Sequence, residues 1–400
     1  MKSYIILTPE IGNMGGGQMY TNNKVLYLKE HGWDVQVFYF KEGGPIKMPH
    51  LKDYDGNVIP EFRCAFYYVP EHRRARIARN IKSIIIGSED IVIESQLIDL
   101  AFWGEDIASR IGANHIVNYI EEQVPLMDDR KLKFFEYKLT HWQMLNAGEG
   151  SQKRVFKDKW KSEYLHYLNP IVYKCSNVVY NVDTDVRIIP SNYTIMTIGR
   201  LDKPYIDEMT DEFVKFASKH KDNTINIIYV GGSPDGMKEK QIQDRFLNIS
   251  NVHLYMLGYC FPVPQKLIDA VDVAVASANS ILVTSDQDIP TISLDMNDHK
   301  AIGVYGYDTE NKFKRSDKEP QVNISNLLED ILLYGKYPRK GKTNDSMADV
   351  IEEFDREVLF LERSVTYSRA YYNLNKIKSK GECFYCQIKW FIHHIIKKFK

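Results

Sequence analysis

The sequence has few cysteines, no excess of charge of either sign and no long hydrophobic run. Its five cysteines are scattered and odd in number, which excludes a disulfide framework and predicts a reducing compartment. The 52 basic residues nearly balance the 53 acidic ones, so the chain lacks the basic excess of proteins that coat nucleic acid, and we expect no nucleic-acid partner. The most apolar stretch, residues 267–283, contains Asp269 and Asp272, and no stretch approaches the ~20 apolar residues of a membrane-spanning helix.

The chain does contain enough apolar residues to build large cores. Hydrophobic residues make up 44% of the 400 residues and charged residues 26%, which excludes disorder as the main state. Cys383 and Cys386 have the spacing of metal ligands, but no second pair accompanies them. We therefore interpret them as two helix residues, with a zinc site as the alternative, and predict no metal and no cofactor apart from a co-substrate.

Short apolar runs alternate with helical patterns along the whole chain, which is typical of parallel α/β sheets. The strands are predicted at residues 4–8, 35–40, 91–94, 115–120 and 178–180, and then at 194–198, 225–230, 252–257, 273–276 and 290–294. The helices are predicted at 19–30, 99–111 and 131–144, then at 207–219, 238–247, 263–270 and 281–286, and finally at 347–372. We predict an α/β fold of two tandem Rossmann-like, doubly wound domains with a cleft between them.

The predicted domains cover residues 1–186 and 187–346, with a linker at 183–191, and a helix at 347–375 is expected to pack back on the N-terminal domain. Residues 376–400 hold seven lysines and one glutamate, with apolar residues at steps of three and four. This pattern is typical of an amphipathic helix that lies on an anionic membrane surface, although a helix packed on the protein core is the alternative.

Ligands bind at the carboxyl ends of open parallel sheets, so the loops that follow the strands form the candidate site. Gly15, Gly16 and Gly17 allow a backbone to approach a ligand closely, and the helix after them offers free N–H groups to a phosphate or sugar oxygen. Their spacing matches neither the Walker A nor the G-x-G-x-x-G pattern, and a flexible turn is the alternative. Arg200 and Lys203 are suited to hold a diphosphate, unless they form a solvated basic turn.

Other strand-end loops carry weaker signals. The turns at residues 231–234 and 258–262 contain glycine, which sharp turns between strands and helices favour anyway. Glu121 and Glu122 end a strand of the first domain, where one of them could orient a sugar or accept a proton, the alternative being a solvated acidic turn. Two further loops, at 94–96 and 277–280, lie at the same kind of strand end.

In their order and spacing, these motifs resemble the GT-B glycosyltransferases, in particular the large retaining family that builds bacterial capsules, lipopolysaccharides and glycolipids from nucleotide sugars. The resemblance covers roughly residues 1–300 and rests on residues 15–18 with 26–35, Asn181-Val182-Asp183, residues 198–201 with Lys203, and residues 252–258, 264–270 and 272–275. It implies that Arg200 and Lys203 stabilise the leaving diphosphate without a metal and that Glu121 assists the transfer. It further implies a donor site made by Gly15, Gly16, Gly17, Gly232, Gly258, Tyr259, Ser277, Asn279 and Ser280.

The chain departs from this family at the Glu-x7-Glu motif. Residues 275–289 contain no glutamate, and Ser277, Asn279 and Ser280 stand where the first glutamate is expected. Either these neutral side chains make the hydrogen bonds to the donor, or the chain binds donor poorly and is not catalytic.

The interpretation we favour is a glycosyltransferase that moves a sugar from a UDP- or GDP-linked donor to a lipid-linked glycan acceptor in cell-surface polysaccharide synthesis. We expect it to retain configuration, to need no metal and to lie on the cytoplasmic face of the cell membrane through residues 376–400. A non-catalytic GT-B subunit that scaffolds or recognises a glycan is the first alternative, and a nucleotide-sugar epimerase is the second.

Overall fold

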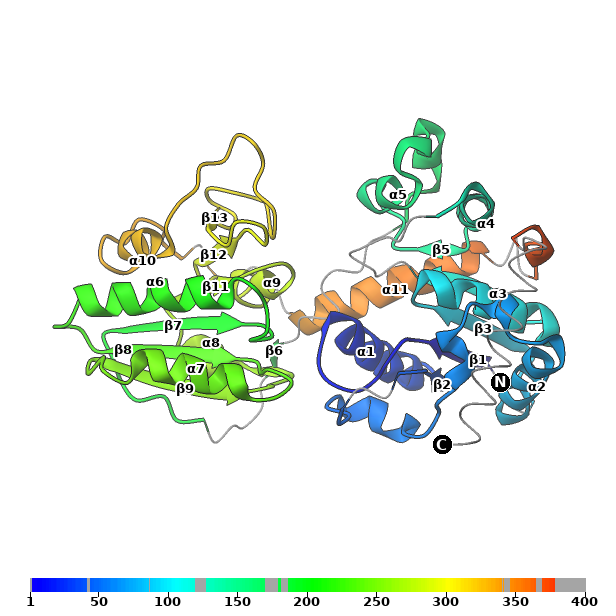
Figure 1. Ribbon diagram of the computed structural model, residues 1–400, viewed down its shortest axis with the longest axis horizontal. Helices are drawn as coiled ribbons and strands as arrows, with labels where there is room; N and C mark the ends of the chain where they lie inside the picture. The colour runs from blue at the N-terminus through cyan, green and yellow to red at the C-terminus, as the bar shows by residue number, and fades with distance from the viewer. Residues whose placement is uncertain are drawn as a thin grey trace. The chain divides into compact units, whose positions relative to one another are not determined.

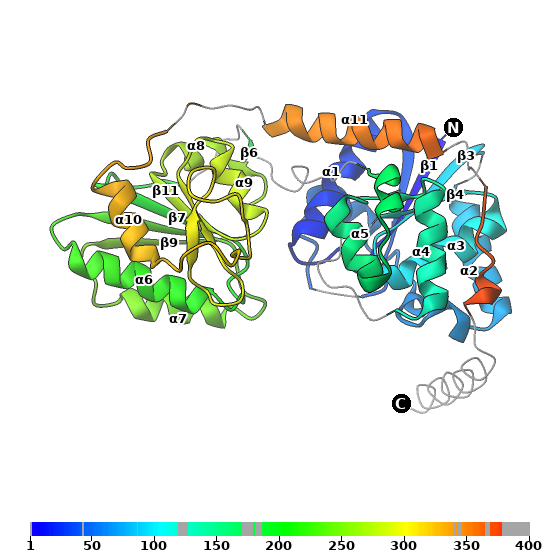
Figure 2. The same ribbon diagram turned by 90° about the horizontal axis from the view of Figure 1, so that it is seen from above.

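The computed structural model describes residues 2–41, 44–85, 87–118, 127–169, 179–180, 186–339, 341, 346–364 and 369–377. The chain forms two compact units, Met1–Val172 with Ile351–Lys400 and Tyr173–Val350, and each unit is considered by itself (Figure 1, Figure 2). Glu121, Glu122, Cys383, Cys386 and the predicted tail beyond residue 377 lie outside the described residues, as does part of the predicted linker.

The first unit contains a five-stranded parallel sheet of order β2-β1-β3-β4-β5. Its strands are β1 (Lys2–Leu7), β2 (Trp33–Phe38), β3 (Asp90–Ser95), β4 (Asn114–Asn118) and β5 (Met144–Leu145). Its helices include α1 (Gly16–Glu30), α2 (Glu71–Ile84), α3 (Ile98–Ile111), α4 (Asp129–Thr140) and α5 (Glu149–Phe156). Residues 4–7 of β1 are fully buried, which explains why this strand is an unbroken apolar run.

Two sequence predictions for the first unit are wrong. The helix predicted at 131–144 ends at Thr140, because Trp142 adopts the left-handed conformation (φ 54°) and the Gln143 N–H bonds back to the carbonyl of Lys138 at 2.8 Å. The chain then enters β5. The strand predicted at 178–180 does not close this sheet, since β6 (Val179–Tyr180) pairs instead with β10 (Val263–Pro264) in the second unit.

The second unit contains a six-stranded sheet of order β13-β12-β11-β7-β8-β9, in which only β13 is antiparallel to its neighbour. Its strands are β7 (Tyr193–Ile198), β8 (Ile225–Val230), β9 (Val252–Gly258), β11 (Val273–Ala276), β12 (Thr291–Leu294) and β13 (Ala301–Val304). Its helices are α6 (Ile206–Lys219), α7 (Met237–Phe246), α8 (Gln265–Asp269), α9 (Ser280–Ser285) and α10 (Ile324–Leu332). The two parallel sheets confirm the predicted fold class, whereas β13 and α10 were not predicted.

Neighbouring residues of the central strands supply two separate cores. Ile195 of β7 and Ile227 of β8 belong to the cluster that includes α6, whereas Met196 and Ile228 belong to the cluster that includes α8. All four side chains are fully buried. Figure 2 shows α6 and α7 on one side of this sheet and α8 on the other. A sheet covered on both faces needs apolar residues at successive positions, so these strands lack polar alternation.

The helix α11 (Ser346–Ser364) brings the chain back to the first unit, where it lies beside α1 (Figure 1, Figure 2). The Tyr27 hydroxyl donates to Asp355 at 2.6 Å, and the Tyr27 ring packs on Phe354. Of the helical pattern predicted over 347–372, residues 347–364 are helical in α11 and residues 369–372 are not. Residues 369–377 continue along the first unit, where the Tyr371 hydroxyl donates to the carbonyl of Ala113.

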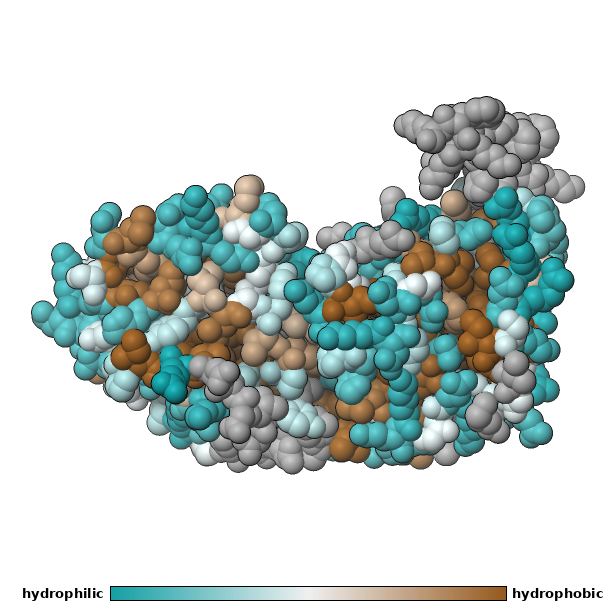
Figure 3. Space-filling view, turned by 90° about the horizontal axis from the view of Figure 1, so that it is seen from below, coloured by the Kyte–Doolittle hydropathy of each residue, from teal (hydrophilic) through white to brown (hydrophobic). Residues whose placement is uncertain are grey.

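The surface is mixed in character. Figure 3 shows separate hydrophobic patches between the hydrophilic residues of one face. Within the ranges that the structure describes, there is no helix both long enough and apolar enough to cross a membrane.

Candidate functional site

Three glycine turns pack against one another where strands of the second sheet end. The Gly199 N–H donates to the carbonyl of Val230 at 2.9 Å, and the Gly231 N–H donates to the carbonyl of Gly258 at 2.7 Å. Gly231 has φ 145°, and a Cβ on it would overlap the carbonyl oxygen of Gly199. No other residue fits at Gly231, which is buried, so this glycine is required by the close packing of the turns against each other.

Arg200 and Lys203 lie in the loop that follows β7, at this same edge. The Arg200 side chain is 48% exposed and its Nε lies 3.4 Å from a carboxylate oxygen of Asp202. Burial raises the pKa of Tyr205 to about 12, and the nearby Arg200 charge partly offsets this rise. The pKa of Tyr259 is also raised by burial and lowered in part by Arg200. The Arg200 side chain is therefore about half exposed, and its charge acts to lower the pKa of both phenol groups.

Tyr259 joins two of the predicted donor-binding loops. Its hydroxyl donates to the carbonyl of Gly232 at 2.9 Å, and a Cβ on Gly232 would lie 2.9 Å from its ring. The next residue, Ser233, donates its N–H to Glu239 at 2.7 Å, which holds the loop after β8 in place. The structure thus brings Arg200, Gly232 and Tyr259 together on one surface.

The segment 277–280 follows β11, which is the neighbour of β7 in the sheet. Ser277 is only 5% exposed, and its hydroxyl donates to the carbonyl of Leu294 at 3.2 Å. Asn279 and Ser280 are half-buried. Ala278 between them has φ 57°, a left-handed conformation that is uncommon for a residue other than glycine.

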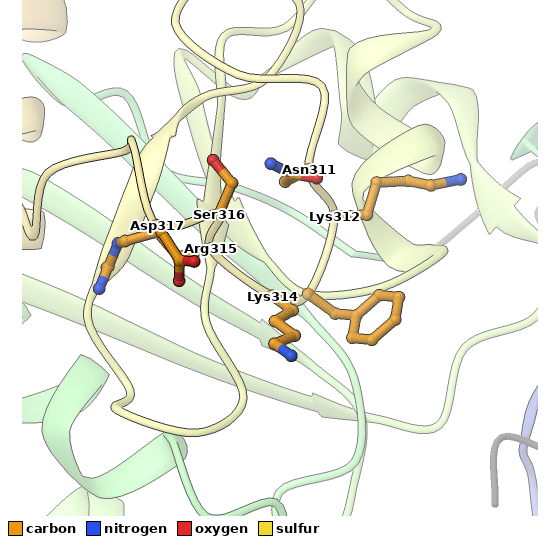
Figure 4. A pocket seen from close by; sticks show the side chains of 7 residues that line it. Asn311, Lys312, Lys314, Arg315, Ser316 and Asp317 are labelled. Carbon is orange, nitrogen blue, oxygen red and sulfur yellow. The ribbon is translucent and has the colours of Figure 1, made fainter. Parts of the chain in front are cut away.

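Sequence reasoning missed a loop at this edge. The Ala278 N–H donates to the carbonyl of Lys312 at 2.6 Å, and the Arg315 N–H donates to Asp295 at 2.7 Å. Residues 311–317 line a cavity of about 410 Å³ (Figure 4). The signal that could have found it is the run of cations Lys312, Lys314 and Arg315 in a polar segment after β13.

In the first unit, the predicted glycine turn lies between β1 and α1. Gly15 is the N-cap of α1 in an extended conformation, with no side-chain cap, and the first turn of the helix carries no acidic residue. Gly16 is exposed and Gly15 and Gly17 are half-buried, and a Cβ on Gly16 would meet nothing within 4 Å. The free N–H groups of this helix start face no competing carboxylate in its own first turn.

A buried ionic cluster lies near the carboxyl ends of β3 and β4, where a loop was predicted at 94–96. Glu94 belongs to β3 and is fully buried. The Lys24 ammonium lies 2.6 Å from Glu94 and 2.5 Å from Glu357 of α11. Tyr4 and Asn118 donate hydrogen bonds to Glu94 at 2.7 and 2.8 Å. The single Lys24 ammonium group is therefore paired with two carboxylates.

The pKa shifts in this cluster follow from burial and from the shared ammonium. Burial disfavours the charge of Glu94, but Lys24 and the hydrogen bonds from Asn118 and Tyr4 bring its pKa below the ordinary value. Burial raises the pKa of Glu357, and Lys24 only partly offsets that rise. The two carboxylates together keep the pKa of Lys24 above its ordinary value in spite of its burial.

A second buried cluster has the residue types of a hydrolytic triad. His115 lies 3.0 Å from the Ser95 hydroxyl and 2.7 Å from Glu105, and Lys138 forms an ion pair with Glu105. Burial and the Lys138 charge lower the pKa of His115 to about 4. Because all four side chains are buried, no substrate reaches them and we interpret the cluster as structural. No group of three or more metal-ligating side chains occurs in the part of the chain that the structure describes.

A scan against models of known protein families finds no match, and a search among curated proteins finds none. Solved structures do match. A glycosyltransferase from Rickettsia africae has a TM-score of 0.59 at 14% identity, covering 95% of this chain and 99% of that one. HepE from Anabaena in complex with UDP and glucose has a TM-score of 0.52 at 12% identity, covering 92% and 100%.

The chain has the GT-B fold. Sucrose-phosphate synthase from Thermosynechococcus elongatus agrees, with a TM-score of 0.51 at 14% identity over 92% of this chain and 98% of that one. At such identities the likeness establishes the GT-B architecture alone, and the function has to be argued from the side chains.

Proposed function

We propose that the protein is a glycosyltransferase that uses a nucleotide-diphosphate sugar. The observation that carries the proposal is the pair Arg200 and Lys203 beside the packed glycine turns at the carboxyl edge of the second sheet. Ligands of open parallel sheets bind at this edge, and cations there favour an anionic ligand. HepE is described with UDP and with UDP-glucose, which supports a nucleotide sugar as the donor.

The proposed chemistry needs few side chains. As the glycosidic bond breaks, negative charge develops on the leaving diphosphate, and fixed cations at that position stabilise the transition state by several kcal/mol. We assign this role to Arg200 and Lys203, without a metal. The acceptor hydroxyl attacks on the face from which the diphosphate departs, with retention. Glu121 orients the sugar or accepts the proton, and Gly15, Gly16 and Gly17 approach the ligand through their backbone.

A second candidate is a non-catalytic GT-B subunit that recognises a glycan. Residues 275–289 contain no glutamate, and the Ser277 hydroxyl at that strand end is buried and already bonded to Leu294. The exposed cation Arg200, close to Lys203 in sequence, favours an anionic ligand, which a neutral glycan does not supply.

A panel of nucleotides distinguishes the two candidates. We expect UDP, GDP, ADP or CMP to raise the thermal stability of the full chain, because a ligand at 100 times its dissociation constant adds about 2.7 kcal/mol to the free energy of unfolding. The measurement is a melting curve of the same protein with each nucleotide, with uridine and guanosine as uncharged controls. If no nucleotide shifts the curve, the glycosyltransferase proposal fails and the non-catalytic subunit replaces it.

We further propose that the acceptor is a lipid-linked glycan of cell-surface polysaccharide synthesis and that residues 376–400 hold the protein on the cytoplasmic membrane surface. Each lysine near an anionic leaflet contributes ~1 kcal/mol at best, so the seven lysines and the apolar stripe act together.

Deleting residues 383–400 is expected to release the protein from anionic vesicles into the supernatant, because the deletion removes the apolar stripe and four of the seven lysines. Co-sedimentation with anionic vesicles measures this, and neutral vesicles are the control. A truncated protein that still sediments with anionic vesicles would show that another surface is the anchor. The next surface to test is then α2, which carries a basic run at residues 72–79 with Arg76 and Arg79 exposed, through Arg76→Gln with Arg79→Gln.

A further inference from the structure

The loop of residues 309–319 follows the carboxyl edge of the second sheet. The Met296 N–H, just beyond β12, donates to the carbonyl of Phe313 at 2.9 Å. The Ala278 N–H, just beyond β11, donates to the carbonyl of Lys312 at 2.6 Å. Two successive carbonyl groups of the loop are therefore bonded to the segments that follow β11 and β12.

Further contacts hold the same loop in shape. The Ser293 hydroxyl of β12 donates to the carbonyl of Asn311 at 2.6 Å. The Glu319 carboxylate accepts hydrogen bonds from the Asn311 side chain and from the Ser316 N–H, each at 2.7 Å. A loop braced in this way presents its exposed side chains in defined places.

The charged side chains of this loop do not gather around one ligand. Arg315 pairs with Asp298 and donates to the carbonyl of Ala301 at 2.7 Å. Lys312 also has an interaction partner, and Figure 4 shows its side chain pointing away from Arg315 and Asp317. Charge therefore does not indicate which ligand this part of the edge takes.

Phe313 is the one apolar residue of the loop, and its side chain is exposed. It lines the cavity of about 410 Å³, and it is 53% exposed. No other phenylalanine in the described part of the chain is exposed. Phe313 belongs to neither hydrophobic cluster of the second unit. A phenyl ring has no polar atom that water can bond, so a ring held at this edge favours an apolar ligand surface.

The strand order places Phe313 close to the proposed diphosphate site. β7, which precedes Arg200, is followed in the sheet by β11 and then by β12. Neighbouring strands lie about 4.8 Å apart, so the ends of β7 and β12 are separated by about 10 Å, with residues 277–280 between them. A sugar joined to a diphosphate at Arg200 and Lys203 has room over residues 277–280, within reach of the phenyl ring.

We propose that Phe313 stacks on the apolar face of the donor sugar and positions that sugar for transfer. The inference rests on the proposed function, because it assigns the diphosphate to Arg200 and Lys203. A pyranose ring carries hydroxyl groups at its rim and C–H groups on its faces, so an aromatic ring covers a face while the rim keeps its hydrogen bonds. The inference therefore names a nucleotide-linked pyranose as the donor class.

Calorimetric titration of the full chain tests the contact by comparing UDP-glucose, UDP-galactose and GDP-mannose with UDP and GDP. In Phe313→Ala, we expect the affinity for the nucleotide sugar that the unchanged protein binds to fall by roughly fivefold or more, while the affinity for the free diphosphate stays the same. Phe313→Tyr keeps the flat ring and should retain the sugar affinity, whereas Phe313→Leu should lose it. Tyr334→Ala removes another exposed aromatic ring of the second unit and should change neither affinity.

The possible results separate this inference from the proposed function. If Phe313→Ala binds the nucleotide sugar as tightly as the unchanged protein does, the stacking contact is refuted, whereas the glycosyltransferase proposal stands. If the nucleotide sugar and the free diphosphate weaken alike, the loop acts on the diphosphate, which also overturns the inference. If no nucleotide binds to the unchanged protein, the proposed function fails and the inference fails with it. Melting curves of the four variants show whether each one is folded.

Discussion

Replacing Arg200 with alanine is expected to reduce the rate of sugar transfer by at least about 10²-fold while the protein stays folded. The reason is that Arg200 is exposed and makes only a 3.4 Å contact with Asp202, so its loss removes little packing. The transition state, however, loses a fixed cation where the leaving diphosphate gains charge. The measurement is the release of nucleoside diphosphate from whichever donor the nucleotide panel identifies, together with a melting curve.

Two further variants make the Arg200 experiment specific. Arg187→Ala removes another exposed arginine of the second unit, in the segment before β7 and away from the strand ends, and should leave the rate unchanged. Arg200→Lys keeps the charge but loses the planar fork, so partial activity is expected. Full activity in Arg200→Ala would refute the role that we assign to this residue. Loss of activity with a collapsed melting curve would instead point to a structural role.

Replacing Lys24 with methionine is expected to lower the free energy of unfolding by about 3–5 kcal/mol. The substitution leaves Glu94 and Glu357 buried and facing each other without the ammonium that they share. Urea unfolding of the full chain, followed by a probe in the first unit, measures the loss. Lys29→Met on the same helix is the control: its pair with Asp53 is exposed, so its loss should cost less than about 1 kcal/mol.

The same cluster makes stability depend on pH in a definite direction. The pKa of Glu357 is raised in the folded protein, so its proton stabilises the fold at low pH, and this contribution is lost as the pH rises above the ordinary value of 4.5. The pKa of Glu94 is lowered, so its contribution is present above its unfolded value and is lost as the pH falls. In Glu357→Gln, the loss of stability at rising pH should disappear. An unchanged pH profile, or a loss below 1 kcal/mol in Lys24→Met, would contradict the assigned charge balance.

Much of the architecture was predictable because strands in buried parallel sheets are short apolar runs separated by helical periods. Residues 225–230 and 273–276 were assigned with the bounds that the structure shows. The failures have local causes. The helix predicted to 144 ends four residues earlier, at Thr140, just before the left-handed Trp142, and the run at 178–180 pairs with a strand that is distant in sequence. An apolar run alone predicts a strand but does not determine which sheet that strand joins.

The candidate site likewise has a part that the sequence predicts and a part that it does not. The position of Arg200, Lys203 and the glycine turns at the sheet edge was predictable from the sequence, because they lie in the loops after strands and this position depends only on the alternation of elements. The loop of residues 311–317 was missed, because Lys312 reaches that edge through a carbonyl bonded to Ala278, 34 residues earlier.

The amino-acid order by itself determined the alternation of strands and helices, and with it the strand ends at which ligands bind. That pattern is local, since it depends on the spacing of apolar residues along a few turns or strand positions. Only the tertiary structure decided that Lys24 would share its charge with Glu94 and with Glu357, 333 residues further along the chain. Such contacts depend on how whole elements pack against one another. A buried charge is unfavourable unless it is paired, and the partner can come from any element that the fold places beside it.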